Sequence, residues 1–151
     1  MKLYAELIQK NAALQRIHQV LVDRRLIGQA AAYAKFLIQE RVAKGILPNG
    51  RPFKNYSLGY KKKREEAKKP VDKVYLEWTG QMMGDMTWNL IQDYAELYFA
   101  TVRSEEIAGY LSKKGAGRKR KKFPFWCLNA PERAKIRKFY NEKLKVQLKA
   151  L

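Results

Sequence analysis

The sequence predicts an α+β fold: N-terminal helices, a central antiparallel hairpin or small sheet, a C-terminal helix and long basic loops. Apolar residues recur at helical spacing near both ends of the chain, and two short runs rich in β-branched and aromatic residues lie between them. At 151 residues the chain has the length of a single domain. We expect a helical region (1–44), an extended basic loop (45–75), an α+β core (76–128) and a C-terminal helix (129–151).

The helical region contains two amphipathic stretches, one from Leu3 to Val22 and one from about Gly28 to Lys44. Alanines favour a helix in the second stretch, and Gly45 is suited to end it. The polar group Asp23-Arg24-Arg25 predicts an end or a bend between the two stretches. The region is therefore either a helical hairpin or one long bent helix.

The next region begins with Pro48-Asn49-Gly50, which has the chemistry of a turn because proline fixes φ and Asn-Gly tolerates positive φ. Phe53 and Tyr56 are expected to anchor this region to the core. The charged segment Lys61 to Lys69 is either an exposed helical turn or a mobile segment. Pro70 ends it.

The core region begins with a short helix that we expect the Thr79 hydroxyl to cap, next to Gly80, with Met82, Met83 and Met86 facing the interior. Thr87 to Ile91 and Leu97 to Val102 are then expected to pair as an antiparallel hairpin, joined by the polar residues between them.

A second short helix is expected to start at Ser104 and to end near Gly115. Phe123 to Leu128 predicts a short buried strand in which Phe125, Trp126 and Cys127 are all buried, with Trp126 as an anchor. Asn129 as a cap and Pro131 in the first turn predict a final helix from about Ala130 to Lys149.

The charge is large and unevenly distributed. The chain has 32 basic and 14 acidic residues, a formal net charge of +18 and an isoelectric point near 10.1. Residues 70–112 are net acidic, whereas the segments on both sides are net basic. This pattern indicates a polyanionic or acidic partner. The acidic middle either folds onto the basic arms, or brings copies together head to tail, or is simply solvated.

Two basic segments supply the expected contacts with a partner protein or DNA. For the second segment, nucleic-acid contact, ordering against another protein and plain solvation are all compatible with the sequence. The candidate contact residues are Lys61, Lys62, Lys63, Arg64, Lys68, Lys69, Lys113, Lys114, Arg118, Lys119, Arg120, Lys121 and Lys122.

The sequence contains no pattern typical of an enzyme. One histidine and one cysteine cannot form the usual zinc cluster, and neither a phosphate-binding glycine motif nor a nucleophile elbow is present. Asp85, Asp93 and Glu96 come without an accompanying catalytic motif. We therefore expect no catalytic, metal or cofactor site. No apolar stretch approaches the length of a membrane span, so we also expect no membrane partner.

The order of the motifs resembles that of the tailed-phage virion morphogenesis proteins, the tail completion or head–tail joining group with Mu-like and lambda-like neck and tail components. The motifs are a helical N-terminus, Pro48-Asn49-Gly50-Arg51-Pro52-Phe53, Leu76-x-x-Thr79-Gly80-x-Met82, a hairpin, Ile107-Ala108-x-Tyr110-Leu111 with Gly115, and Phe123-Pro124-Phe125 before a terminal helix. The motifs that carry this resemblance are short, but together they extend over most of the chain.

The resemblance implies a non-enzymatic subunit of the virion neck or upper tail. It implies a homo-oligomeric ring, six- or twelve-fold, that completes the tail and joins it to the head connector. The implied partners are the connector, tail proteins and packaged DNA, and the implied location is the virion, with the host cytoplasm during assembly. The alternative is a basic nucleic-acid-binding protein that contacts the phosphate backbone through its Lys and Arg loops.

Overall fold

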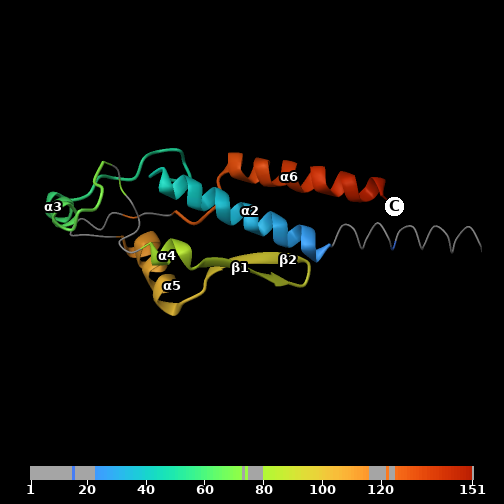
Figure 1. The fold of residues 1–151 in the computed structure, drawn as a ribbon, viewed down its shortest axis with the longest axis horizontal. Coiled ribbons are helices and arrows are strands. Elements are labelled where there is room, and N and C mark those ends of the chain that lie inside the picture. The colour runs from blue at the N-terminus through green and yellow to red at the C-terminus, as the bar shows by residue number, and fades with distance from the viewer. Residues whose placement is uncertain are drawn as a thin grey trace, which may run out of the picture.

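The computed structural model describes Gln15 and residues 23–72, 74, 80–115, 122 and 125–150. Within these residues the predicted α+β class is confirmed: five α-helices and one π-helical segment accompany a two-stranded antiparallel sheet. The amphipathic stretch expected from Leu3 to Val22 lies outside the described residues, apart from Gln15. Element labels follow Figure 1.

Helix α2 (Arg24–Ala43) begins earlier than the expected Gly28, because Asp23 caps it by accepting a hydrogen bond from the Arg25 backbone N–H at 2.8 Å. The expected stop at Gly45 is confirmed. Gly45 has a φ of +70°, its N–H donates to the Val42 carbonyl, and the next N–H, of Ile46, reaches the Arg41 carbonyl. This pair of bonds satisfies carbonyls that the end of a helix would otherwise leave open.

Helix α6 (Ala130–Lys149) has the predicted bounds. The Asn129 side chain accepts from the Glu132 N–H, and the Glu132 carboxylate accepts from the Asn129 N–H, each at 2.8 Å. This capping box and Pro131 in the first turn explain why the helix begins there. The helix runs antiparallel to α2 (Figure 1), so the start of each helix lies beside the end of the other.

The hairpin consists of β1 (Met86–Ile91) and β2 (Tyr94–Phe99) in a register that pairs Met86 with Phe99 and Ile91 with Tyr94. The predicted hairpin is therefore present, but its turn is only the two residues Gln92 and Asp93, with Gln92 at a φ of +52°. The expected bounds of the second strand, Leu97 to Val102, were wrong at both ends. The strand begins at Tyr94, because the alternation of polar Glu96 with apolar neighbours belongs to a strand with one solvated face, and it ends at Phe99, since Val102 already starts the next helix.

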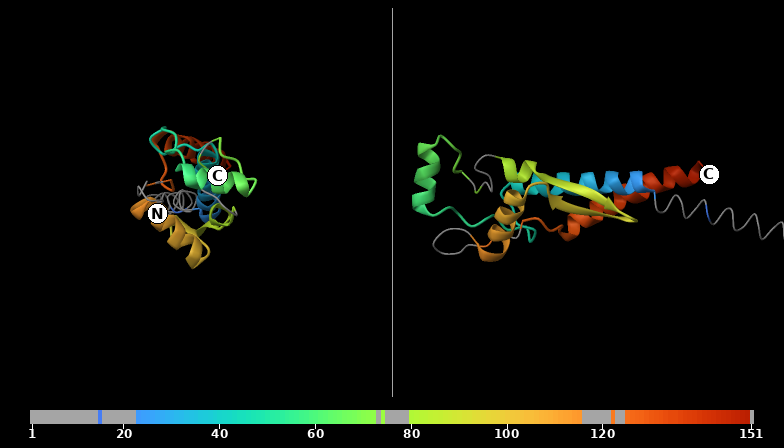
Figure 2. Two further views of the ribbon diagram at one scale, coloured as in Figure 1. Left: turned by 90° about the vertical axis from the view of Figure 1, so that its left-hand side faces the viewer. Right: turned by 90° about the horizontal axis from the view of Figure 1, so that it is seen from below.

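Helix α2 lies between the other two layers of the body: α6 packs on one side and the hairpin on the other (Figures 1 and 2). Gly28 allows the close approach of the hairpin, since a Cβ built on it would lie 3.0 Å from the Trp88 ring. Among the described residues, the buried core joins side chains from α2 to the segment before α6: Ile38, Val42, Phe53, Val74, Met82, Met86, Phe99, Ala108 and Phe125. Phe53 and Met82 thus occupy the core positions expected for them, and Met83 and Tyr56 are partly buried against this cluster.

Two short helices close one end of the hairpin. Helix α4 (Gln81–Gly84) has Gly80, at a φ of +79°, as its N-cap, and the expected cap Thr79 lies outside the described residues. Helix α5 (Val102–Gly109) is capped by Thr101 and not by Ser104, which is buried in its first turn. It continues as the π-helical segment η1 (Tyr110–Lys114), which ends at the expected Gly115.

The segment before α6 differs from its prediction. Residues 125–128 form bends and irregular backbone and not a strand. Phe125 is fully buried, as expected, but Trp126 is 40% exposed and Cys127 is exposed. Phe125 is the fully buried residue of this segment, and Leu128 is partly buried against the same core, while the Trp126 ring lies at the surface, 5.8 Å from the Phe99 ring. The prediction that all three side chains are buried was therefore wrong for two of them.

Candidate functional site

The segment from Lys54 to Pro70, here called the basic arm, contains helix α3 (Leu58–Glu66). The predicted extended loop over residues 45–75 is therefore wrong in part, and the helical alternative for the charged segment is confirmed. The helix stands crosswise to α2 at the end of the molecule opposite the C-terminus (Figure 2). It has few contacts with the helices and strands of the body. The arm is therefore a projection and not a layer of the fold.

Local backbone bonds define where α3 ends. The N–H of Lys68 donates to the Glu65 carbonyl, and that of Lys69 donates to the Arg64 carbonyl, at 2.9 and 2.8 Å. Lys68 adopts a φ of +53°, a conformation that usually requires glycine or asparagine. The arm therefore turns back sharply after α3.

Arg64 fixes this turn from inside. Its side chain is buried, with 2% exposure, and its Nε donates to the Pro70 carbonyl at 3.1 Å. Its guanidinium lies over the Tyr56 ring, 5.1 Å from the centroid, and the Tyr60 ring packs edge-on against Tyr56. The expectation that Arg64 contacts a partner was wrong, because it holds together the two chain segments that flank α3. Tyr56 is confirmed as an anchor to the core, and through its contact with Arg64 it also holds the arm together.

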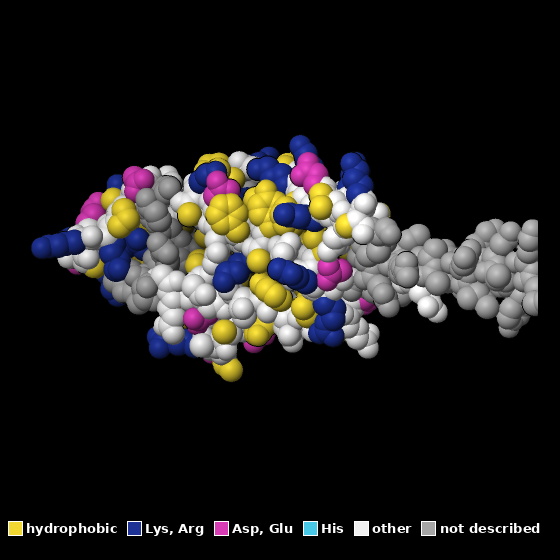
Figure 3. Space-filling view, turned by 45° about the vertical axis from the view of Figure 1, so that its right-hand side comes forward, with side chains coloured by type: hydrophobic (Ala, Val, Ile, Leu, Met, Phe, Trp, Pro, Cys, Tyr) yellow, Lys and Arg dark blue, Asp and Glu magenta, His cyan; other side chains and the backbone are white. Residues whose placement is uncertain are grey.

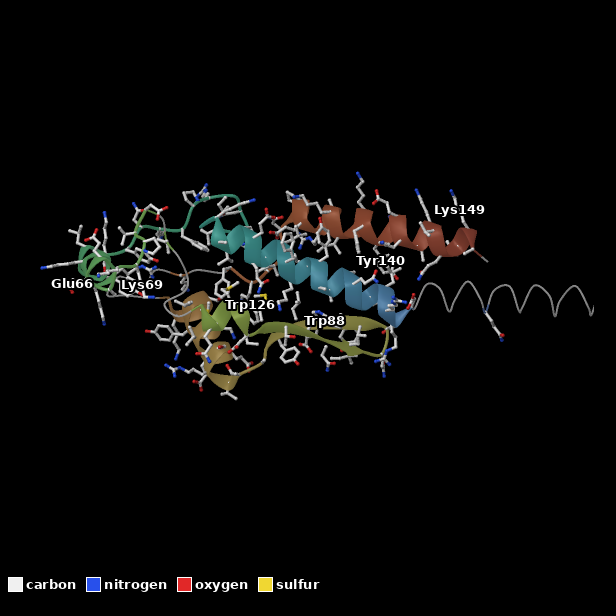
Figure 4. All side chains as sticks on the ribbon, viewed as in Figure 1. Glu66, Lys69, Trp88, Trp126, Tyr140 and Lys149 are labelled. Atoms are coloured by element: carbon white, nitrogen blue, oxygen red, sulfur yellow. The ribbon has the colours of Figure 1, made fainter. Side chains whose placement is uncertain are left out.

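The other side chains of α3 and its turn face outward. Lys61, Lys62, Lys63 and Lys68 are exposed, and Lys69 is half-buried. Leu58 is 87% exposed, the highest value among the exposed large hydrophobic residues. Glu66 and Lys69, which Figure 4 labels, lie beside each other at this end of the molecule, next to α3. The arm thus presents an apolar side chain next to a group of lysines, which is a surface suited to binding.

The second predicted basic group is described only in part. Lys113 and Lys114 are exposed on η1, and Lys122 is exposed, whereas Arg118, Lys119, Arg120 and Lys121 lie outside the described residues. Helices α5 and α3 both lie toward the end of the molecule opposite the C-terminus (Figure 1). Lys113 and Lys114, which follow α5 directly, therefore lie toward the same end as the arm.

The sequence reasoning missed a third basic surface, the outer face of α6. Seven basic residues of this helix are exposed, and the one exposed acidic residue among them is Glu142. They are Arg133, Lys135, Arg137, Lys138, Lys143, Lys145 and Lys149. The signal was present in the sequence: Ile136, Phe139 and Leu144 recur at helical spacing on one side, which leaves Lys138, Lys145 and Lys149 on the other. Figure 3 shows one face of the body, on which Lys and Arg side chains lie between hydrophobic and acidic ones.

Buried polar contacts give this third surface a rigid support. Arg41 on α2 donates through Nε to Glu132 on α6 at 2.6 Å, and its Nη2 donates to the carbonyls of Phe125 and Cys127 at 2.8 Å each. Both side chains of the ion pair are 7% exposed. At the other end of α6, the Gln147 amide donates to the Asp23 carboxylate at 2.6 Å, which lowers the pKa of Asp23. The helix is thus attached to α2 at both ends.

A second polar cluster joins α5 to the hairpin. The hydroxyls of Ser104 and Thr101 donate to one carboxylate oxygen of Asp85 at 2.6 and 2.7 Å. These bonds, first that from Ser104, lower the pKa of Asp85. A carboxylate that accepts two hydroxyl hydrogen bonds in this way serves to position α5.

The described residues offer little for reaction chemistry. Among them, no three His, Cys, Asp or Glu side chains come together in a group that could hold a metal ion. None of the helices in this part of the chain is long and apolar enough to cross a membrane. Comparison with protein-family models, with curated proteins and with solved structures finds no match to this chain.

Proposed function

We propose that the chain is a structural subunit of a tailed-phage virion, one that forms a ring at the neck or upper tail, completes the tail and joins it to the head connector. The family resemblance of the motif order supports this proposal. The basic arm carries the structural argument: it is a preformed projection, outside the body, with an exposed apolar side chain among lysines. Such a projection suits contact with a neighbouring subunit.

The pinning of the arm by Arg64 adds to this argument. A mobile charged loop loses conformational entropy when it binds, whereas a helix already held by Tyr56 and Pro70 loses less. The surface that this helix offers a neighbour combines Leu58 with Lys61 and Lys62. Acidic side chains that make no described ion pair, including Asp93, Glu96, Glu105 and Glu106, lie exposed elsewhere on the body and complement those lysines in charge.

Mass photometry and negative-stain imaging of the purified chain test the proposal. We expect rings, alone or upon mixing with isolated phage heads or tails. Leu58→Glu in the arm is expected to prevent ring formation. The matched control is Val146→Glu, which replaces an aliphatic residue that is 67% exposed on α6 and is expected to leave the rings intact. A chain that stays monomeric and joins neither heads nor tails would contradict the proposal.

The second candidate function is nucleic-acid binding by the single chain, and the exposed lysines of α3, η1 and α6 favour it. The two functions predict different affinities of the single chain for duplex DNA. A dedicated binder is expected to bind random duplex tightly as a monomer, with a steep dependence on salt. A ring subunit is expected to bind free DNA weakly as a monomer, because each copy supplies only a few of the contacts that the ring makes together.

A further inference from the structure

We infer that the outer face of α6, and not the basic arm, contacts the phosphate backbone of duplex DNA. This assignment rests on the proposed function for its choice of DNA as the polyanion, since packaged DNA passes through the neck. The division of roles follows from the structure: on the arm the exposed apolar Leu58 stands among the lysines, whereas on α6 three lysines share one side of the helix and the exposed Val146 and Leu148 lie at other positions around it.

Lys138, Lys145 and Lys149 lie on one side of α6, because positions separated by seven and by eleven residues share a helix face. All three are exposed. At 1.5 Å per residue the three lysines span about 16 Å. Over that length a duplex presents roughly ten phosphates. One face of the helix can thus reach several phosphates at once without a change in backbone conformation.

Few acidic groups oppose this surface. Glu132, at the start of α6, is buried against Arg41 and is directed away from the outer face. Glu142 is exposed on the same side, four residues after Lys138 and three before Lys145, and its Oε1 lies 4.0 Å from the Lys138 Nζ, so it offsets one of the positive charges. The surface therefore remains strongly cationic. In contrast, Glu65 and Glu66 stand among the lysines of the arm and reduce its charge.

A basic helix can also bind an anionic membrane surface, but α6 lacks the free apolar face that such binding uses. Its apolar residues Ile136, Phe139 and Leu144 are partly buried on the side that packs against α2. The Phe139 ring lies 5.2 Å from that of Tyr33 on α2. The capping box and the Asp23 to Gln147 bond hold the helix in place at its ends. We therefore assign duplex DNA as the partner and treat the membrane as an outcome of the test.

The test measures binding of the full chain to a random duplex by fluorescence anisotropy across salt concentrations. Each lost phosphate contact lowers the slope of log affinity against log salt by about 0.9. For Lys138→Ala/Lys145→Ala/Lys149→Ala, we expect a slope smaller by two to three, roughly. When salt rises from roughly 50 to 200 mM, the affinity of the wild type then falls by a factor about 40 times larger than the factor for the variant. The matched control is Lys61→Ala/Lys62→Ala/Lys68→Ala in the arm, which is expected to keep the wild-type slope.

Alanine favours a helix, so the α6 variant is expected to fold, and its thermal unfolding is measured first. Should the triple variant fail to fold, the single change Lys145→Ala is read in the same way, with an expected slope change of about 0.9. The variant with arginine at all three α6 positions keeps the charge and is expected to restore the wild-type slope.

Three results would overturn the inference: a wild type that binds no duplex at low salt, a slope that falls in the arm variant and not in the α6 variant, and binding to phosphatidylserine vesicles without binding to duplex. The fate of the proposed function is read separately, from ring formation. Rings without α6-dependent DNA binding would overturn this inference alone, and α6-dependent binding by a chain that never assembles would overturn the proposed function alone.

Discussion

The body and the basic arm each contain a buried arginine, but the two arginines connect different parts of the chain. Arg41 bonds to Glu132, 91 residues away, and to carbonyls 84 and 86 residues away. The contacts described for Arg64 are local: the Pro70 carbonyl, six residues on, and the ring of Tyr56. The body therefore depends on contacts between distant segments, whereas the described contacts of Arg64 stay within the arm. We expect the body to unfold as a unit and the arm to open by itself.

The largest expected effect in the body comes from Glu132→Ala. The change leaves the Arg41 guanidinium buried without its carboxylate, which costs about 3 to 5 kcal/mol in free energy of unfolding. Urea denaturation measures the loss. The control is Asn129→Ala, which removes the cap side chain and keeps the ion pair, at a cost of about 1 kcal/mol.

The double change Arg41→Met with Glu132→Leu tests whether the cost of Glu132→Ala comes from the unpaired charge of Arg41. It replaces both charges with apolar groups and is expected to recover much of the stability that Glu132→Ala loses. If Glu132→Ala costs no more than Asn129→Ala, the ion pair does not hold α2 and α6 together.

The next largest effect is expected where the hairpin meets α2. Gly28→Val would place a side chain against the Trp88 ring, because even a Cβ lies 3.0 Å from it. Overpacking of this kind costs about 1 to 3 kcal/mol. Gly109→Ala on α5 is the control, since nothing lies within 4 Å of its built Cβ, and alanine there is expected to raise stability by up to about 1 kcal/mol. Thermal unfolding of the two variants is compared; equal effects would mean that the close packing at Gly28 is not required.

In the arm, Arg64→Ala is expected to act locally. The change removes the bond to Pro70 and the packing on Tyr56, which lowers the free energy of opening α3 by about 1 to 2 kcal/mol. Limited trypsin digestion after Lys61, Lys62 and Lys63 is therefore expected to be roughly five- to 30-fold faster. The free energy of unfolding of the body changes by less than about 1 kcal/mol. Leu58→Ala, which changes an exposed residue of α3 and keeps every trypsin site, is the control. A fall in the stability of the whole chain would show that the arm and the body are one cooperative unit.

The smallest effect concerns the pH dependence of stability. Hydrogen bonds from Ser104 and Thr101 lower the pKa of Asp85 below its usual 3.8. The stabilisation is therefore complete well above that value and is lost as the pH falls through the lowered pKa of the folded state. Asp85→Asn is expected to reduce the loss of stability between about pH 6 and pH 3. Asp93→Asn in the hairpin turn serves as the control; the same change in both variants would contradict a special role for Asp85.

The elements best predicted from the sequence are those set by local chemistry. The cap at Asn129, Pro131 in the first turn and the stop at Gly45 act within a few residues, and the structure has each in its expected role. The tight turn of the hairpin was less accessible, because Gln92 at positive φ is unusual for its type. The chain accepts that conformation because strand pairing on both sides fixes the turn.

The features that the sequence did not reveal depend on side-chain contacts beyond the immediate neighbours in the chain. In the run from Lys61 to Arg64, nothing local indicates that one residue is buried and its neighbours are not; the Pro70 carbonyl and the Tyr56 ring decide it. Trp126 was misjudged for a similar reason. It adjoins Phe125 in an apolar run, and only the packing of the core shows that Phe125 alone is fully buried. The basic face of α6 was readable from helical spacing, but its exposure depends on α2 covering the opposite side.

The position of Cys127 provides a direct reporter of the body. Cys127 is the only cysteine in the chain and is exposed at the surface, and its backbone carbonyl accepts a hydrogen bond from Arg41. A thiol-reactive fluorophore would therefore label one known place without any engineered mutation. Its emission would report on the environment next to the Arg41 to Glu132 pair. The same labelled chain can report body unfolding in a denaturation series and docking of neighbours in an assembly reaction.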